Sequence, residues 1–375
     1  MPGEVTAVFA ALSGGVVVTA AEPVMIPLLR RAAIVDVPGG RSSHSVPTPR
    51  GGGAPIAAGV LIAAALIHTW AALMLGTAVA GFAVIGFADD IRGLAAGWRL
   101  ALQAAVALTA AIMLIRPFAA ATAAVLIPLA APIALAALAA LAVVWLVGFA
   151  NAFNFMDGVN GISGAHAVIA GLTYGCLGYW DSDRFLLASG AAVAAGALAF
   201  LPWNAVHAKV FLGDAGSYGL GSALAVLAAY AVLHGVPLEA ATAPLALYLA
   251  DTAWTLQRRI HAGEPWHQAH RTHIYQRWCD LGWSHQRVTV IASAATALLV
   301  MLGSASLTPN AGLHVAADLA GAAVLAVYLA SPFLLGHSGL PGQPGTQGQP
   351  EPLGQPEPLG QPTALGQHGR RAEVR

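Results

Sequence analysis

Apolar segments long enough to cross a lipid bilayer follow one another along almost the whole chain. A transmembrane helix needs about 20 predominantly apolar residues. The chain is 57% hydrophobic and only 9% charged, whereas soluble domains carry about 25% charged residues. A water-facing shell cannot be built from this composition, and the net charge of zero leaves no electrostatic footprint for nucleic acid. We therefore exclude a secreted, disordered or DNA-binding protein and expect an all-α, polytopic membrane domain over residues 1–335.

The apolar runs predict eleven transmembrane helices, and ten is the alternative count. Each run has about the length that a spanning helix requires. The first is not a cleavable signal peptide, because no basic segment precedes it and it is too long. The expected spans are residues 5–29, 54–70, 71–88, 99–115, 133–150, 161–180, 184–201, 215–234, 238–256, 287–305 and 312–335.

Basic residues predict the orientation of these spans. Of the 17 Lys and Arg residues, twelve lie in loops that follow odd-numbered spans and two in loops that follow even-numbered spans. Because basic loops stay on the cytoplasmic side, we expect the odd loops to be cytoplasmic and the N-terminus to lie outside. The last three basic residues belong to residues 336–375, a Gly-, Pro- and Gln-rich segment with an internal repeat. Such a composition predicts a disordered tail.

The dense polar clusters all fall in loops of the same parity. They are Asp89-Asp90, the segment 151–160, the segment 204–214 and the segment 267–273. A secondary transporter would instead bury ionisable groups near the middle of the membrane. The candidates for such groups are His68, His166 and Asp251, and all three lie close to span ends by these boundaries. The arrangement favours a catalytic face on one side of the membrane.

Two of the clusters carry carboxylates beside the membrane. Asp214 stands between glycines where a span begins. Backbone N–H groups at a helix start favour phosphate, and a carboxylate there can hold the divalent cation that phosphates need. A simple helix cap is the alternative reading of Asp214. Asp89 and Asp90 repel each other unless a cation intervenes, and they too have helix capping as an alternative.

The other two clusters repeat polar residues every third position. Asn151, Asn154, Asp157 and Asn160 would share one helical face and present amide and acid groups to a sugar or base. The segment 267–273 repeats His in the same way. Arg271 within it would repel a zinc ion, so we favour binding of a diphosphate over zinc.

In this order, the clusters resemble those of the polyprenyl-phosphate N-acetylhexosamine-1-phosphate transferases, a superfamily of glycosyltransferase family 4 type that includes phospho-N-acetylmuramoyl-pentapeptide transferase. Gly93 stands where the superfamily often has Lys, and Asn160 where some branches have Asp. The His-x-x-His-x-x-His form is closer to the branch that starts O-antigen and other polysaccharides. The matching segments are 47–53, 87–90, 151–161, 211–221 and 267–276.

The resemblance implies a reaction and its partners. The enzyme would transfer N-acetylhexosamine 1-phosphate from a UDP-sugar to undecaprenyl phosphate, which yields UMP and a polyprenyl-diphosphate sugar for a cell-surface polysaccharide. It would lie in the bacterial inner membrane with its active site at the cytoplasmic face, as a monomer or a homodimer. Phospho-N-acetylmuramoyl-pentapeptide transferase of cell-wall synthesis is the alternative enzyme, and a secondary transporter is the alternative class.

The resemblance also implies roles for individual residues. Asp214 would bind Mg²⁺, with Mn²⁺ as the alternative metal, and Asp157 would be a second ligand or a catalytic group. Asp89 would be the base that deprotonates the lipid phosphate, with Asp90 beside it. Such a base is optional, because the second pKa of a phosphate monoester is about 6. The remaining site residues are His270 and His273 as catalytic groups, and Asn151, Asn154, Asn160, Arg50, Arg271 and His267 as substrate-binding groups.

Overall fold

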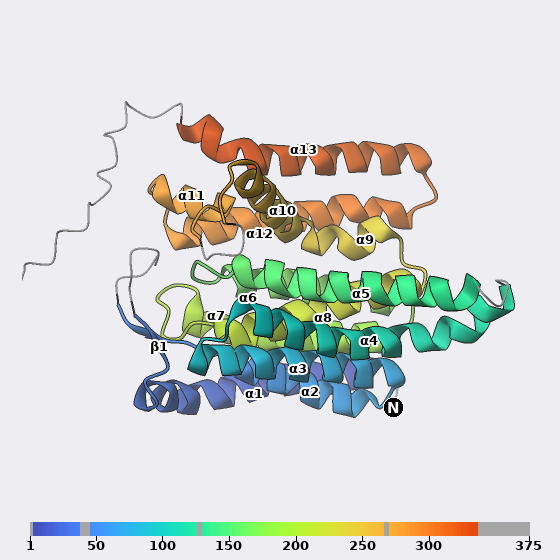
Figure 1. The fold of residues 1–375 in the computed structure, drawn as a ribbon, viewed down its shortest axis with the longest axis horizontal. Helices are drawn as coiled ribbons and strands as arrows, with labels where there is room; N and C mark the ends of the chain where they lie inside the picture. The colour runs from blue at the N-terminus through green and yellow to red at the C-terminus, as the bar shows by residue number, and fades with distance from the viewer. Residues whose placement is uncertain (1–2, 38–45, 126–129, 266–269, 337–375) are drawn as a thin grey trace, which may run out of the picture. The chain divides into compact units, whose positions relative to one another are not determined.

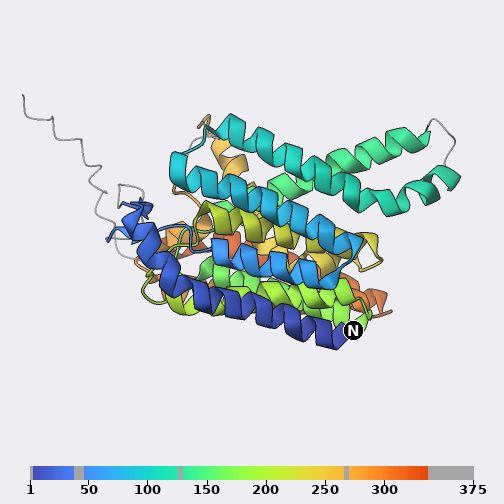
Figure 2. The ribbon, with the colours of Figure 1, turned by 90° about the horizontal axis from the view of Figure 1, so that it is seen from below.

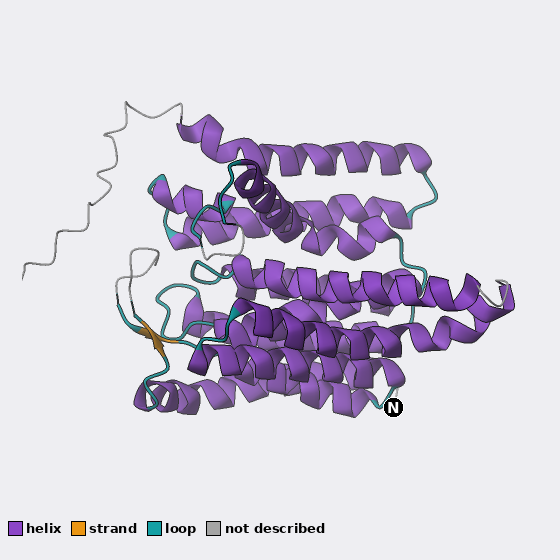
Figure 3. Ribbon diagram, in the orientation of Figure 1, coloured by secondary structure: helices purple, strands orange, loops and turns teal. Residues whose placement is uncertain are grey.

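The computed structural model describes residues 3–37, 46–125, 130–265 and 270–336, and nearly all of them are helical (Figure 1, Figure 3). Within that part of the chain the only sheet is the antiparallel pair β1 (Val35–Asp36) and β2 (Thr48–Pro49). The helices are α1 (Gly3–Arg31), α2 (Ala54–Ile67), α3 (Trp70–Arg92), α4 (Ala96–Val125), α5 (Ala130–Phe155), α6 (Ile162–Trp180), α7 (Arg184–Asn204), α8 (Gly213–Leu233), α9 (Leu238–Thr242), η1 (Ala243–Leu245), α10 (Ala246–His261), α11 (Ile274–Asp280), α12 (His285–Gly303), η2 (Ser304–Leu307) and α13 (Ala311–Gly336).

The protein is an all-α, polytopic membrane protein, as the apolar runs predict. Each expected span overlaps a helix of the structure. Eight helices of the described residues are long and apolar enough to cross a membrane. Of the other three expected spans, α2 has only 14 residues, α6 is not among the eight, and residues 238–256 are divided among α9, η1 and α10. Most of the predicted tail, residues 337–375, lies outside the described residues, so the domain boundary stays a prediction.

Small residues let the spans pack backbone against backbone, as is typical of helices in lipid. A Cβ atom on Gly14 of α1 would overlap the carbonyl oxygen of Ala192 in α7, and one on Gly190 of α7 would overlap the backbone of α6. Helices α3 and α8 also meet in this way, because a Cβ on Gly86 would overlap the backbone of Asp214. These close contacts fix the core of the bundle around α8, the most buried of the long apolar helices.

The polar loops gather at one end of the bundle. Figure 1 shows the strand β1, the ends of α3, α5 and α7 and the helix α11 at the same end, while the N-terminus lies at the opposite end. The view from below shows α1, α2 and α3 crossing the bundle side by side (Figure 2). Helices α9 to α13 lie on the other side of α5 from α1 to α4 (Figure 1). The loops that follow odd-numbered spans, which hold the predicted polar clusters, therefore lie together at one end of the bundle.

Candidate active site

A polar cavity of about 340 Å³ opens at this end of the bundle. That volume falls in the range of small-molecule sites. Its walls come from the first loop, the end of α3, the 154–160 segment, the start of α8 and the segment around α11. The lining residues are Asp36, Arg50, Asp90, Asn154, Asp157, Gly158, Val159, Asn160, Asn204, Phe211, Leu212, Gly213, Asp214, Gln276 and His285.

Backbone pairing joins the first loop to the start of α8. Gly52 N donates to Phe211 O at 2.9 Å, Gly53 N donates to Leu212 O at 2.8 Å, and Phe211 N donates to the carbonyl of Pro49 at 2.8 Å. Gly213 has a φ of +73°, which residues other than glycine rarely adopt. A Cβ on it would also lie 2.5 Å from the nitrogen of Gly51. Two motifs far apart in the sequence are thus held together by their backbones.

Asp90 connects this pairing to α3. Its Oδ1 accepts from the backbone N–H of Asp214 and its Oδ2 from that of Ala215, each at 3.0 Å. The carboxyl therefore satisfies two free N–H groups at the start of α8. Arg50 holds it from the other side, with Nη2 donating to the carbonyl of Asp90 at 2.8 Å and Nε lying 3.7 Å from Oδ1. Asp90 acts as a helix cap supplied by a neighbouring helix, and it also lines the cavity.

Asp214 and Asp157 face the same cavity from two elements. Asp214 Oδ1 accepts from Asn154 Nδ2 at 2.7 Å, and the same amide donates to Ser217 Oγ at 2.8 Å. Burial raises the pKa of the Asp157 carboxyl to about 7, because a charged group loses solvation there. A bound cation would favour the charged form.

The donor set fits a magnesium ion shared with a substrate. Among the described residues, no group of three or more His, Cys, Asp or Glu side chains is placed to hold a metal. Mg²⁺, however, is usually bound through one or two carboxylates, with waters and substrate phosphates completing its octahedron. Asp157 and Asp214, both on the cavity wall, are the two carboxylates of this kind that the sequence predicts.

Asp89 and Asn151 belong to a second polar cluster, beside the cavity lining and not in it. Asp89 Oδ2 pairs with Arg99 Nη1 at 2.7 Å, and Asn151 Nδ2 donates to Gln103 Oε1 at 2.7 Å. Within the described part of the chain, Arg99 Nε, Gln103 Nε2 and Tyr218 Oη are buried here without a well-formed hydrogen bond, although the Gln103 side chain interacts with the Tyr218 hydroxyl. All three can donate, so the cluster offers unused hydrogen bonds to an anion.

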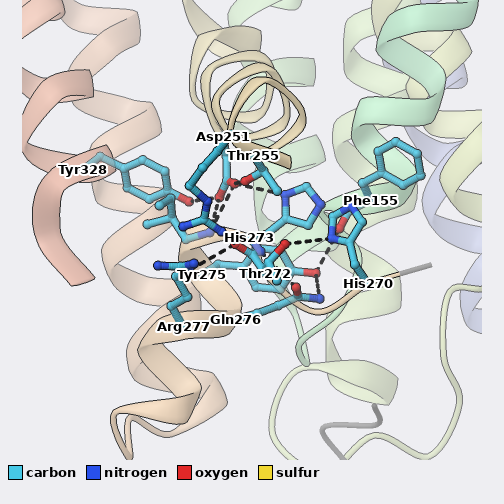
Figure 4. Close-up of polar contacts among 12 residues, drawn as sticks. Phe155, Asp251, Thr255, His270, Thr272, His273, Tyr275, Gln276, Arg277 and Tyr328 are labelled. Atoms are coloured by element: carbon cyan, nitrogen blue, oxygen red, sulfur yellow. Dashed lines mark hydrogen bonds and ion pairs between the residues drawn. The ribbon is translucent and has the colours of Figure 1, made fainter. Parts of the chain in front are cut away.

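We call residues 267–276 the histidine segment; of its described residues, 270–276, Gln276 lines the cavity. His273 is buried, and its Nδ1 lies 3.0 Å from Asp251 Oδ1 (Figure 4). Burial lowers the pKa of His270 to about 4, so this side chain is neutral near pH 7. Arg271 pairs with Asp280 at 3.1 Å, and His267 lies outside the described residues. Among the described residues that line the cavity, Arg50 therefore supplies the positive charge.

Four polar lining residues, Asp36, Asn204, Gln276 and His285, had no role in the sequence-based site. Asn204 accepts from Gly161 N at 2.7 Å and donates to Val210 O at 3.0 Å, which braces the cavity wall. Asn204 lies within the predicted polar cluster 204–214, and Gln276 lies within the matching segment 267–276. Those positions are the signal by which the sequence could have indicated them. Asp36 lies in β1, and His285 is the first residue of α12, between Ser284 and Gln286; no repeated spacing marks either of them.

Comparisons with known proteins agree with the motif order. The family model described as glycosyl transferase family 4 matches residues 70–232. A probable undecaprenyl-phosphate N-acetylglucosaminyl 1-phosphate transferase of Bacillus subtilis (strain 168) is 29% identical over 285 residues, which is 72% of this chain and 77% of the relative. A phospho-N-acetylmuramoyl-pentapeptide-transferase of Geobacillus kaustophilus is 33% identical, but over only 37% of this chain and 40% of the relative. The family model covers α3 to α8 and ends before the histidine segment.

Proposed function

Because this chain is a member of the glycosyl transferase family 4 superfamily, we propose that it transfers N-acetylhexosamine 1-phosphate from a UDP-sugar to undecaprenyl phosphate. One observation carries the proposal. Residues from all five matching segments, which are separated in the sequence, line one polar cavity whose wall carries carboxylates, amides and Arg50. A mixture of this kind suits a phosphorylated sugar and its cation better than it suits an apolar ligand.

The proposed reaction is a single displacement. An oxygen of the lipid phosphate attacks the sugar-bearing phosphorus, and the bond from that phosphorus to the bridging oxygen breaks. UMP leaves with the electron pair of that bond, and a polyprenyl-diphosphate sugar is formed. Both substrates are anions, so the site has to supply positioning and positive charge more than covalent help.

We assign the cavity to the sugar nucleotide. Asp157 and Asp214 would hold Mg²⁺, or Mn²⁺ in its place, and the ion would neutralise negative charge that develops on the diphosphate. Arg50 lies at the wall and can donate to a phosphate oxygen. Asn154 holds the carboxyl of Asp214 in place at 2.7 Å, and Asn160 offers an amide to the sugar or base.

We assign the acceptor lipid to the cluster beside the cavity. Its phosphate would take the unused hydrogen bonds of Arg99, Gln103 and Tyr218. An apolar groove of about 220 Å³, lined by residues such as Leu114 and Trp145, lies further along the same three helices, α4, α5 and α8. Leu114 follows Gln103 by eleven residues on α4, a rise of about 16 Å, which a long polyprenyl chain can bridge.

The assay that tests the function uses membranes containing the protein, undecaprenyl phosphate, Mg²⁺ and a panel of UDP-sugars. We expect a labelled lipid product and UMP in equal amounts with a UDP-N-acetylhexosamine. Activity only with the UDP-N-acetylmuramoyl-pentapeptide would instead identify the alternative enzyme of cell-wall synthesis. Lack of transfer from every donor, with substrate uptake into vesicles, would favour a transporter and contradict the proposal. A product that enters O-antigen synthesis would identify the pathway.

We further propose that the protein lies in the bacterial inner membrane with the cavity at the cytoplasmic face. The support is the excess of Lys and Arg in the loops at the cavity end. Cysteines introduced at Ser43 and at Ser182 should be labelled from opposite sides of the membrane, and an impermeant reagent should reach only position 182 in intact cells. Labelling of position 43 from outside would reverse this topology.

A further inference from the structure

The carboxyl group of Asp251, on α10, is completely buried and lies at the centre of a hydrogen-bond network (Figure 4). Its Oδ2 accepts from Tyr328 Oη of α13 at 2.7 Å. Its Oδ1 accepts from Thr255 Oγ1 of its own helix at 3.1 Å. Two further partners, His273 and Ile274, belong to the histidine segment. The residue thus joins three separate elements at one carboxyl.

The contacts to the histidine segment fix where α11 begins. His273 Nδ1 lies 3.0 Å from Asp251 Oδ1, and Ile274 N donates to both carboxyl oxygens at 3.2 and 3.1 Å. His273 is the residue before the helix, and its own N–H is satisfied by Gln276 Oε1 at 3.2 Å. The first N–H groups of a helix need partners from outside it. Asp251 supplies one for Ile274.

From α11, contacts continue to the cavity. Tyr275 Oη donates to the carbonyl of Phe155, at the end of α5, at 2.9 Å. Gly158 packs directly on the Tyr275 side chain, and a Cβ there would overlap the hydroxyl. Gln276 Nε2 donates to that hydroxyl at 3.0 Å, and both Gly158 and Gln276 line the cavity. The position of α11 therefore sets one wall of the cavity and supports the loop that carries Asp157.

We propose that Asp251 is a positioning residue for the sugar-nucleotide side of the cavity, acting through His273 and Ile274 on Tyr275 and Gln276. This inference rests on the proposed function. It assigns a role to a buried carboxyl that does not itself line the cavity, and Tyr328 shares that role from the C-terminal helix. Among the described residues, none that lines the α4–α5–α8 groove is a member of this network, so we expect the effect to be confined to the sugar nucleotide.

The test compares Asp251→Asn with a matched substitution at the other end of the bundle. Asn keeps the size, but its NH₂ group would face at least one of the N–H and O–H donors and leave it unpaired. We expect the KM for the UDP-sugar to rise about tenfold, while the KM for undecaprenyl phosphate stays within about twofold. Asp183→Asn is the control, because Asp183 also accepts from a tyrosine, Tyr230, at 3.0 Å and caps α7. It should change neither KM.

A milder substitution keeps the test informative if Asp251→Asn does not fold. Tyr328→Phe removes one donor and leaves the carboxyl in place, so we expect the same selective rise in KM at a smaller size, about threefold. A purely structural role would lower the amount of active enzyme and leave both KM values unchanged. Unchanged KM values in folded Asp251→Asn or Tyr328→Phe enzyme would overturn the inference.

A second measurement does not depend on catalysis. A cysteine at Thr272, in a background with Cys176 and Cys279 replaced by Ala, reports how open the histidine segment is to a thiol reagent. We expect faster labelling in Asp251→Asn than in the parent, and no change in Asp183→Asn. Equal labelling in all three would show that Asp251 does not hold the segment. If the parent transfers no sugar phosphate, the proposed function fails while this measurement still decides the contact.

Discussion

The two sides of the cavity are built by different kinds of contact. On the α3–α8 side, backbone meets backbone: Gly53 N donates to Leu212 O at 2.8 Å, and α3 touches α8 at Gly86. On the α11 side, the side chains of His273, just before α11, and Tyr328, on α13, meet one carboxyl, that of Asp251 on α10. A wall of backbone contacts tolerates no added atoms, whereas a wall of side-chain contacts depends on the chemistry of a few groups. Substitutions that add atoms should therefore disturb the α3–α8 side, and substitutions that alter a polar group should disturb the α11 side.

The largest effect is expected at Asp214, on the backbone-built side. Asp214→Asn keeps the size and can still accept from Asn154, but it removes the negative charge on which a hard cation depends. We expect turnover to fall by at least about 10²-fold, comparable to the loss of a main electrostatic group. Initial rates over a range of Mg²⁺ concentrations would measure it, and raised Mg²⁺ should recover part of the loss.

Asp183→Asn is the control for Asp214→Asn, since it makes the same change at a helix cap far from the cavity. It should retain the activity of the parent. The alternative reading of Asp214 as a helix cap is wrong, because Asp90 bonds the first N–H groups of α8. A purely structural role for Asp214 predicts nearly normal activity for its variant too, because Asn can also accept from Asn154. Full activity of Asp214→Asn at low Mg²⁺ would contradict the metal assignment.

The second effect concerns the backbone contact between the first loop and α8. A Cβ on Gly216 would lie 2.5 Å from Gly53 Cα and 2.7 Å from the side chain of Leu212. Gly216→Ala should therefore lower the free energy of unfolding by about 1–3 kcal/mol. Gly148→Ala is the matched control, because no heavy atom lies within 4 Å of that position in α5. Alanine should stabilise a helix there, by up to about 1 kcal/mol. Thermal unfolding in detergent would measure both, and equal midpoints would contradict the close contact.

The spans and the motifs could be read from the sequence because both depend on local patterns. An apolar run is long enough to span or it is not, and each expected span overlaps a helix. The sequence also predicted part of the cavity wall. The predicted site residues that line the cavity are Arg50, Asp90, Asn154, Asp157, Asn160 and Asp214. Their chemical roles stay predictions.

Long-range pairing could not be read in the same way. Nothing in the sequence places the carboxyl of Asp90 on the first N–H groups of α8, 124 residues later. His273 repeats at the spacing of a substrate-binding face, yet its Nδ1 pairs with Asp251, a residue that sequence alone marks only as a buried acid. Spacing shows which residues share a face of one helix, but not which other helix that face meets.

A third, smaller effect should separate the acceptor from the donor substrate. Arg99→Ala removes a guanidinium group whose Nη1 pairs with Asp89 and whose Nε, beside Gln103, has no hydrogen-bond partner among the described residues. We expect the KM for undecaprenyl phosphate to rise about tenfold, because a charge-assisted hydrogen bond to phosphate is lost. The KM for the UDP-sugar should stay nearly constant. Arg116→Ala, on the same helix but packed on the ring of Trp70, is the control. A rise in the KM for the UDP-sugar alone would contradict this assignment. It would assign the UDP-sugar to the Arg99 cluster and the lipid phosphate to the cavity.

The smallest effect is expected at the C-terminus. Residues 337–375 are rich in Gly, Pro and Gln and contain no residue of the predicted site. Truncation after Gly336 should therefore leave transferase activity within about twofold of the full chain. Truncation after Ala326 is the informative comparison, because it also removes Tyr328, the partner of Asp251, and Ser331, whose Oγ accepts from Trp278 Nε1 of α11 at 2.8 Å. If the α11 side depends on these side chains, only the second truncation should raise the KM for the UDP-sugar. A tenfold loss already after Gly336, at equal expression, would show that the tail itself contributes to the site.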